Sequence, residues 1–232
     1  MAQIARRLAA VIARIRDAEQ RFQRREGSVT LLAVSKTHPA DHIAEAARAG
    51  QQRFGENYVQ EAIRKQELLS GHNLEWHFIG PIQSNKTRRI ALHFAWVHSV
   101  DRLEIAQRLS NQRPRELRPL NVCLQVNICG EPTKSGLLPH ELAATAEAVA
   151  ELPRLRLRGL MTIPAPEADF ERQRQPFARL REARDTLITR GVLLDTLSMG
   201  MSDDIEAAIA EGSTLVRVGT AIFGPRRPRL SD

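Results

Sequence analysis

The chain has 232 residues, of which 42% are apolar and 26% are charged, and a chain of this kind can bury one sizeable core. No apolar run is long enough to span a bilayer, and residues 1–7 lack the apolar core and cleavage site of a signal peptide. The net charge of +7 would favour nucleic acid, but aromatic residues make up only 4% and are not interleaved with the arginines, so platforms for stacking single strands are missing. We expect a cytoplasmic protein that binds neither nucleic acid nor membrane. The alternative is a basic helix that binds RNA or a membrane surface.

Apolar residues recur at helical spacing in the first segment, with arginines on the other faces, which predicts a leading amphipathic helix over 1–27. After it, short aliphatic or β-branched runs alternate with helical stretches. The runs cover 30–35, 52–55, 76–79, 95–99, 121–128, 156–161, 195–199 and 215–219, and the helical stretches cover 40–49, 59–69, 102–111, 141–151, 171–189 and 204–210.

Eight strands that alternate with helices indicate parallel βα units. At this length the economical closed form is an α/β fold of the TIM-barrel type, (β/α)8. An open doubly wound sheet is the alternative, but no Gly-x-Gly-x-x-Gly turn follows the first strand. No linker divides the chain, so we expect one domain over 1–232, with a basic tail at 225–232.

Lys36 directly follows the first predicted strand, in a chain that has four lysines and thirty arginines. In a (β/α)8 barrel the chemistry collects at the carboxyl ends of the strands. A buried lysine can lose its proton and form a Schiff base with an aldehyde, whereas arginine stays protonated. Taken alone, Lys36 is more simply interpreted as a solvated residue at a strand end.

Turns of small residues follow the last two predicted strands, at Ser198-Met199-Gly200 and at Gly219-Thr220. Loops after strands seven and eight of such barrels are the habitual phosphate site, where backbone N–H groups, hydroxyls and a helix N-terminus can hold the anion. Together with Lys36, these turns indicate a phosphorylated aldehyde as ligand. Arg217 lies two residues before Gly219 and points to the same side of the strand, toward the ligand or, alternatively, toward an interior carboxylate.

Other candidates predict no catalytic or metal site. His38 and His42 are four residues apart but have no third ligand, so they are expected to be surface histidines. Cys123 and Cys129 fit no zinc or redox spacing and are expected to be buried thiols. His77 lies inside a predicted strand and is expected to be packed. No serine has the Gly-x-Ser-x-Gly setting of a hydrolase.

Several longer motifs extend from the first strand to Gly224. They are Val34-Ser35-Lys36-Thr37, Phe54-Gly55-Glu56-Asn57-Tyr58, His77-Phe78-Ile79-Gly80-Pro81-Ile82-Gln83-Ser84-Asn85-Lys86, Lys134-Ser135-Gly136, Arg158-Gly159-Leu160-Met161, Ser198-Met199-Gly200-Met201-Ser202-Asp203 and Arg217-Val218-Gly219-Thr220-Ala221-Ile222-Phe223-Gly224. In combination they resemble the pyridoxal phosphate homeostasis proteins, the YggS/PROSC family, and especially its bacterial branch.

The resemblance implies a barrel like the N-terminal domain of alanine racemase, with pyridoxal 5′-phosphate (PLP) in its mouth. Lys36 matches the lysine that forms the Schiff base. The other matched positions are Asn57 beside the cofactor, Arg217 near the pyridine nitrogen or phosphate, and Ser198, Met199, Gly219 and Thr220 around the phosphate. Lys86 and Lys134 match further lysines that could contact a second PLP, whereas His38 stands where close relatives often carry a lysine.

The function implied by the resemblance is binding of PLP without evident catalysis, to hold, buffer or deliver it and so keep vitamin B6 pools in balance. Apo PLP-dependent enzymes are the expected partners, and a monomer is the expected state. The alternative is a weak PLP-dependent amino-acid racemase. An arginine beside the pyridine nitrogen would disfavour protonation of the ring, and alanine racemases take a second acid/base tyrosine from a further domain, whereas Tyr58 is the only tyrosine here.

Overall fold

The structure is a computed structural model that describes residues 2–225. The predicted basic tail therefore lies outside the described residues except for its first position. In chain order the elements are α1 (Ala2–Arg21), β1 (Thr30–Val34), α2 (Ala40–Arg48), β2 (Arg53–Glu56), α3 (Val59–Leu68), β3 (Glu75–Phe78), a 3-10 helix η1 (Ser84–Lys86), α4 (Thr87–His93), β4 (Trp96–Val100), α5 (Leu103–Gln112), β5 (Leu120–Gln125), α6 (Pro139–Ala150), β6 (Leu155–Met161), α7 (Phe170–Thr189), β7 (Thr196–Ser198), α8 (Ile205–Ala210), β8 (Leu215–Val218) and α9 (Thr220–Phe223).

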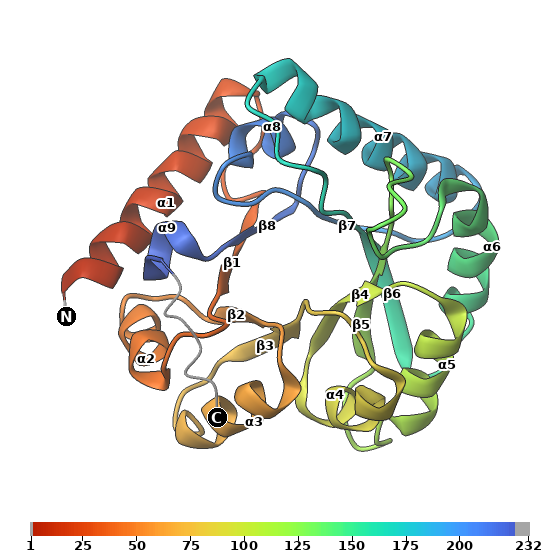
Figure 1. Cartoon of the computed structure of the whole chain (residues 1–232), viewed down its shortest axis with the longest axis horizontal. Coiled ribbons are helices and arrows are strands. Elements are labelled where there is room, and N and C mark those ends of the chain that lie inside the picture. The colour runs from red at the N-terminus through yellow and green to blue at the C-terminus, as the bar shows by residue number, and fades with distance from the viewer. Residues whose placement is uncertain (1, 226–232) are drawn as a thin grey trace.

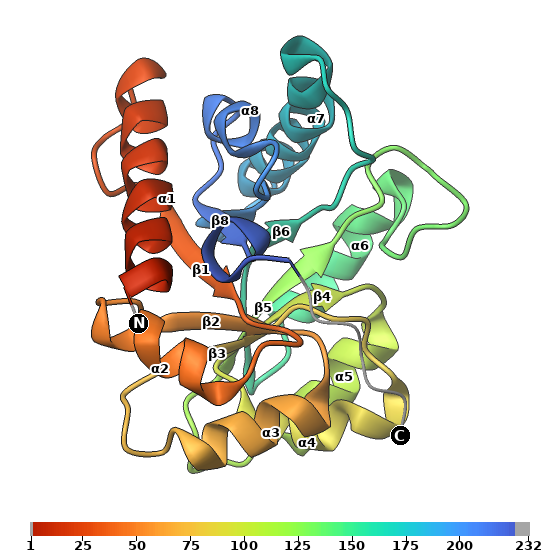
Figure 2. The ribbon, with the colours of Figure 1, turned by 60° about the vertical axis from the view of Figure 1, so that its left-hand side comes forward.

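The eight strands pair in parallel with their sequence neighbours, and β8 pairs with β1 to close the barrel. The predicted (β/α)8 fold is therefore confirmed. Figure 1 shows the helices as an outer ring around the strands. The leading helix α1 packs beside α8 and α9, and the view in Figure 2 shows it upright along that side of the barrel. No helix within residues 2–225 has the length and apolarity needed to cross a membrane.

The structure differs from the sequence prediction at the end of the leading helix and in the segment after β3. The leading helix ends at Arg21 rather than near residue 27. The backbone of Gln23 takes a positive φ of 54°, and the buried carboxylate of Glu19 accepts hydrogen bonds from the N–H groups of Gly27 and Val29, which holds the segment after the helix as a loop. In addition, η1 and α4 form a helical segment that the sequence patterns did not predict.

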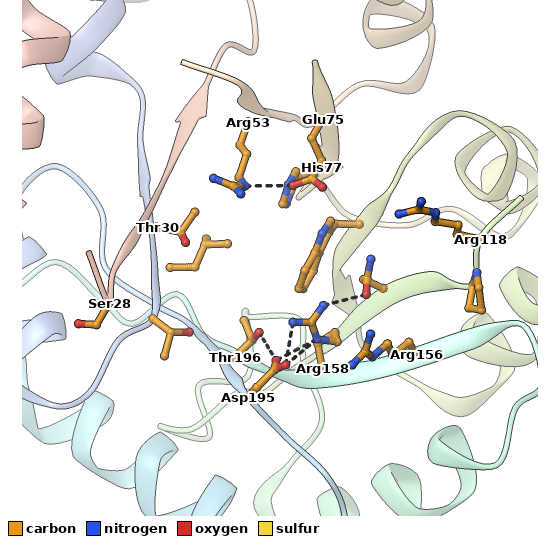
Figure 3. Close-up of a pocket in the computed structure, with 15 residues that line it drawn as sticks. Ser28, Thr30, Arg53, Glu75, His77, Arg118, Arg156, Arg158, Asp195 and Thr196 are labelled. Atoms are coloured by element: carbon orange, nitrogen blue, oxygen red, sulfur yellow. Dashed lines mark hydrogen bonds and ion pairs between the residues drawn. The ribbon is translucent and has the colours of Figure 1, made fainter. Parts of the chain in front are cut away.

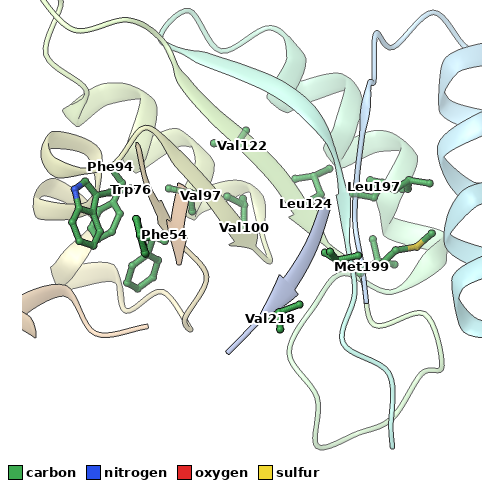
Figure 4. Close-up of a cluster of buried hydrophobic side chains, with 14 of the residues drawn as sticks. Phe54, Trp76, Phe94, Val97, Val100, Val122, Leu124, Leu197, Met199 and Val218 are labelled. Atoms are coloured by element: carbon green, nitrogen blue, oxygen red, sulfur yellow. The ribbon is translucent and has the colours of Figure 1, made fainter. Parts of the chain in front are cut away.

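The main apolar core lies between the strands and the surrounding helices. Phe54, Trp76, Phe94, Val97 and Val218 belong to it, and Figure 4 shows them with their neighbours around the strands. Because successive strand residues alternate between the two faces, the other face of each strand points into the barrel. That interior holds polar as well as apolar side chains, and a small separate apolar cluster is formed by Trp96, Cys123 and Met161.

Gly159 allows β6 and β7 to approach each other. A Cβ built on Gly159 would overlap the main-chain oxygen of Thr196, its register partner on β7. Replacing Gly159 with alanine should therefore lower the free energy of unfolding by about 1–3 kcal/mol, because the strands must shift to make room. Urea unfolding measures the change. The matched control is Gly71→Ala, where the added Cβ meets nothing within 4 Å; an equal loss in both variants would contradict the explanation.

Candidate functional site

A cavity of about 560 Å³ opens at the carboxyl ends of the strands, between β1, β2 and the loops after β7 and β8. It brings together five residues predicted from the sequence, which are Lys36, Asn57, Arg217, Gly219 and Thr220. These residues come from segments up to 184 positions apart, and only closure of the barrel makes them neighbours. The cavity is therefore the candidate ligand site.

Lys36 lies in the turn that follows β1, and the backbone on both sides of it is fixed. The N–H of Ser35 donates to the carbonyl of Gly55 at 3.0 Å, and the N–H of Thr37 donates to the carboxylate of Glu61 at 2.7 Å. Thr37 has a φ of +66°, which is strained for a β-branched residue. Strain of this kind persists only where the surrounding contacts impose it. Here those contacts fix the direction of the backbone at Lys36.

A largely buried network of ion pairs around Lys65 supports the turn that contains Lys36. The ammonium of Lys65 contacts Glu56 at 2.7 Å, Glu61 at 2.6 Å and the carbonyl of Ser35 at 2.8 Å. The Ser35 hydroxyl also donates to Glu56 at 2.7 Å. Burial raises the pKa of Glu56, while Lys65 acts in the opposite direction. Lys65 thus holds three groups that flank Lys36, a role that the sequence prediction did not assign to it.

Arg217 reaches the cavity from β8 and is buried, at 4% exposure. Its Nη1 donates to the carbonyl of Ser198 at 2.6 Å and to the Ser198 hydroxyl at 2.8 Å, and its Nη2 donates to the carbonyl of Thr162 at 2.9 Å. Burial lowers the pKa of Arg217 to about 10, against the attraction of Asp204, so the guanidinium remains charged at neutral pH. Within the described residues its hydrogen-bond partners are neutral oxygens rather than a carboxylate, which favours the ligand-facing alternative.

The turn after β7 is arranged differently from the sequence prediction. Ser198 and Met199 are fully buried, and the N–H of Met199 is occupied by the carbonyl of Leu215 at 3.1 Å. Neither residue is on the cavity wall, where Met201 and Ser202 represent this turn instead. Ser198 therefore meets the site only through its hydrogen bonds to Arg217.

The start of α9 and the side chain of Asn57 offer complementary groups to a ligand. Thr220 begins α9, and the first N–H groups of a helix have no partner within the helix. A Cβ on Gly219 would lie 3.1 Å from the carbonyl oxygen of Val34, so glycine allows this corner to pack closely against the end of β1. The Oδ1 atom of Asn57 is buried without a hydrogen-bond partner among residues 2–225. A buried acceptor of this kind requires a donor, which a bound molecule could supply.

Two further side chains on the cavity wall, those of Arg14 and His38, were not predicted to lie there. Arg14 of the leading helix lies on it, bound to the carboxylate of Glu206 and to the carbonyl of Ser202. The partners of Arg14 lie too far along the chain for local sequence patterns to reveal them. His38 also lies on the wall and is only 5% exposed, with its ring 5.1 Å from that of Phe223. The prediction of a surface histidine at position 38 was therefore wrong.

The remaining lysines lie apart from Lys36. Lys134 lines a neighbouring cavity of about 330 Å³, which shares Asn57, Ile79 and Ile163 with the first, and its ammonium contacts Glu131 at 2.7 Å. Lys86 ends η1 and is on the wall of neither cavity.

The two cysteines differ in exposure. Cys123 is buried, and burial raises the pKa of its thiol to about 12, whereas Cys129 is exposed, so the prediction of two buried thiols was wrong for Cys129. No group of three potential metal ligands occurs within residues 2–225.

Comparison with known proteins supports the barrel fold and identifies the family. Residues 7–227 match the family model described as alanine racemase, N-terminal domain. The chain is 62% identical to the pyridoxal phosphate homeostasis protein of Pseudomonas aeruginosa over 226 residues, which cover 97% of each chain. It is 58% identical to the protein of the same name from Escherichia coli over 229 residues, covering 97% and 98% of the two chains.

Solved structures show the same relationship. PipY of Synechococcus elongatus with PLP bound is 41% identical and superposes with a TM-score of 0.83, covering 96% of this chain and all of PipY. The alanine racemase of Corynebacterium glutamicum shares the fold, with a TM-score of 0.67 at 18% identity, over 97% of this chain and 63% of the racemase. The barrel, the sequence motifs and these relatives together show that the chain belongs to the pyridoxal phosphate homeostasis protein family.

Proposed function

We propose that this protein binds PLP in the cavity around Lys36 and holds, buffers or delivers it, so that the cellular pool of vitamin B6 stays in balance. The observation that carries the proposal is the meeting of a lysine amine, a buried arginine and a glycine-containing helix start around one cavity. The names of the relatives, and the PLP bound in PipY, support the same ligand.

The residues present fit the chemical groups of PLP. Its aldehyde can condense with a primary amine and thereby tether the cofactor. Lys36 would supply that amine, so that a C=N bond forms and water leaves. The Gly219-Thr220 corner and the start of α9 would hold the phosphate, and Ser202 adds a hydroxyl on the same wall. Asn57 and Arg217 would face the ring, where the buried Oδ1 of Asn57 needs a donor.

We further infer that the protein does not use PLP as a catalyst. A charged Arg217 beside the pyridine nitrogen would disfavour protonation of the ring and so make it a poorer electron sink. A racemase also needs a second acid/base opposite the lysine. Tyr58 is the only tyrosine of the chain, is 40% exposed, and is not on the wall of the Lys36 cavity. We also propose a cytoplasmic, monomeric protein of one domain over 1–232, with apo PLP-dependent enzymes as recipients.

The test is to titrate the purified protein with PLP, reduce it with borohydride, and map the adduct by mass spectrometry. We expect one phosphopyridoxyl group, located on Lys36. The same preparation incubated with L-alanine should show no racemisation above that of free PLP by chiral chromatography. An absence of adduct would contradict the binding proposal, and turnover well above free PLP would favour the racemase alternative.

A further inference from the structure

A continuous chain of polar side chains crosses the interior of the barrel. At the amino ends of the strands, Glu75 contacts Nε2 of His77 at 3.0 Å, beside a cavity of about 710 Å³ (Figure 3). The Nδ1 atom of His77 then meets Nε2 of His98 at 2.9 Å, and Nδ1 of His98 meets the Ser198 hydroxyl at 2.7 Å. Ser198 in turn accepts from Arg217 at 2.8 Å. We name these five residues the interior relay.

The two ends of the interior relay differ in their exposure to solvent. Its middle members are His77, His98 and Ser198, each at most 1% exposed, whereas the side chain of Glu75 is 40% exposed in the amino-end cavity. Arg217 occupies the far end, on the wall of the Lys36 cavity. The relay therefore joins a solvent-facing carboxylate to the buried guanidinium of the candidate site.

The charges at the two ends fix which atom donates at every step. The hydrogen bond from His77 lowers the pKa of Glu75, so its carboxylate is an acceptor and Nε2 of His77 carries the proton. Burial lowers the pKa of both histidines, which are therefore neutral with one proton each. It follows that His98 donates from Nε2 to His77 and accepts at Nδ1 from Ser198.

This order leaves the Ser198 oxygen free to accept from Arg217. The guanidinium of Arg217 has five N–H donors, and Ser198 and Thr162 take three of them. The Nε–H and one Nη2–H are the donors that remain for a ligand. Since His77, His98 and Ser198 each use both a donor and an acceptor, the hydrogen-bond order that begins at Glu75 continues without a break to Arg217.

We propose that His98 is a positioning residue that acts through Ser198 to hold Arg217 against a bound pyridine ring, and that Glu75 sets the direction of this hydrogen-bond chain. The inference rests on the proposed binding of PLP in the Lys36 cavity. His98 and Glu75 would then affect the affinity for PLP although neither residue is on the wall of the Lys36 cavity.

The first test replaces His98 with phenylalanine, which removes both hydrogen bonds and keeps a planar ring. The probe is pyridoxine 5′-phosphate, which lacks the aldehyde and so reports ring and phosphate contacts without lysine chemistry. We expect its dissociation constant to rise about tenfold, in line with the loss of roughly one well-made buried hydrogen bond. The visible absorption maximum of bound PLP should also shift. His98→Asn keeps an acceptor near the Nδ1 position and should restore most of the affinity.

A matched control distinguishes the positioning role of His98 from a purely structural role. Thr87→Val also removes a buried hydroxyl hydrogen bond, to the carbonyl of Ser84 at 2.9 Å. Thr87 lies outside both the Lys36 cavity and the neighbouring cavity that Lys134 lines. Both variants should lose thermal stability, but only the His98 variant should change affinity and absorption. If His98→Phe matches Thr87→Val in all three measurements, the proposal is overturned.

A second pair of variants tests the direction of the relay at Glu75, whose side chain is 40% exposed. Glu75→Leu removes the acceptor, so both histidines can exchange their proton positions and the Ser198 hydroxyl loses its fixed orientation. Glu75→Gln keeps an oxygen there, because Arg53 donates to the same Oε1 atom at 3.2 Å and orients the amide. We expect weaker pyridoxine 5′-phosphate binding in the leucine variant and near wild-type binding in the glutamine variant.

The outcomes separate this inference from the proposed function. If the wild-type protein forms no borohydride-stable adduct with PLP, the proposed function fails. If the wild type binds PLP but the His98 and Glu75 variants bind both probes equally well, the proposed function stands and the relay has no positioning role.

Discussion

Replacing Lys36 with alanine should abolish the borohydride-stable phosphopyridoxyl adduct and weaken PLP binding by about 100-fold, which corresponds to about 2.8 kcal/mol. The variant loses the only lysine on the wall of the cavity. Asn57, Arg217 and the Gly219-Thr220 corner remain, so residual binding through the ring and phosphate is expected. Absorption spectroscopy and mass spectrometry before and after reduction measure both effects.

The chain supplies its own matched controls for the Lys36 variant. Lys134→Ala removes a lysine from the neighbouring cavity, and Lys86→Ala removes one that lies outside both cavities. Both should retain an adduct on Lys36 at the wild-type yield. An intact adduct in Lys36→Ala would show that another amine holds the cofactor. Loss of binding in the Lys134 variant alone would move the site to the neighbouring cavity.

The fold was predictable from the sequence because parallel barrels impose a regular pattern. The eight strand runs coincide with β1 to β8, since buried parallel strands are continuous apolar segments bounded by turns. Helix α4 was missed because its sequence, from Thr87 to His93, is short and rich in basic residues. Its helical form depends on packing of Ile90 and Ala91 against the barrel rather than on a long amphipathic repeat.

The candidate site was only partly predictable, and the limit was sequence distance. Strand-end residues such as Lys36 and Gly219 could be placed at the barrel mouth by counting strands. Arg14 could not, because its partner Glu206 is 192 residues away. The same holds for His98 and Ser198, which are 100 residues apart and meet only across the closed barrel. Ser198 and Met199 were predicted to lie around the phosphate, but in the structure Met201 and Ser202 of the same turn are on the cavity wall.

The largest effect on stability is expected from Lys65→Met, which should lower the free energy of unfolding by about 3–5 kcal/mol. Glu56 is fully buried and Lys65 nearly so, and removing the ammonium leaves the Glu56 carboxylate without its counter-charge. Such a loss is a large part of the about 5–15 kcal/mol that keeps a typical domain folded. Urea unfolding measures it. PLP affinity should fall as well, since Lys65 also holds the carbonyl of Ser35 beside Lys36.

The pH dependence of Lys65→Met identifies the buried carboxylate as the cause. Burial raises the pKa of Glu56 in the folded protein, and the positive charge of Lys65 is the main influence that opposes the rise, so the variant should raise this pKa further. A carboxyl group with a raised folded pKa contributes its full stability below its unfolded pKa and loses it as the pH rises through the folded value. The deficit of Lys65→Met should therefore be small near pH 4 and large near pH 8.

Two comparisons complete the test of the buried pair. Adding Glu56→Gln to Lys65→Met removes the orphaned charge and keeps an acceptor for the Ser35 hydroxyl, so the double variant should be more stable than the single one at pH 8. Arg190→Met breaks the exposed pair with Glu147 and should cost at most about 1 kcal/mol. A double variant that is no more stable than Lys65→Met would show that packing of the lysine stem, and not the charge of Glu56, makes Lys65 necessary beneath the Lys36 turn.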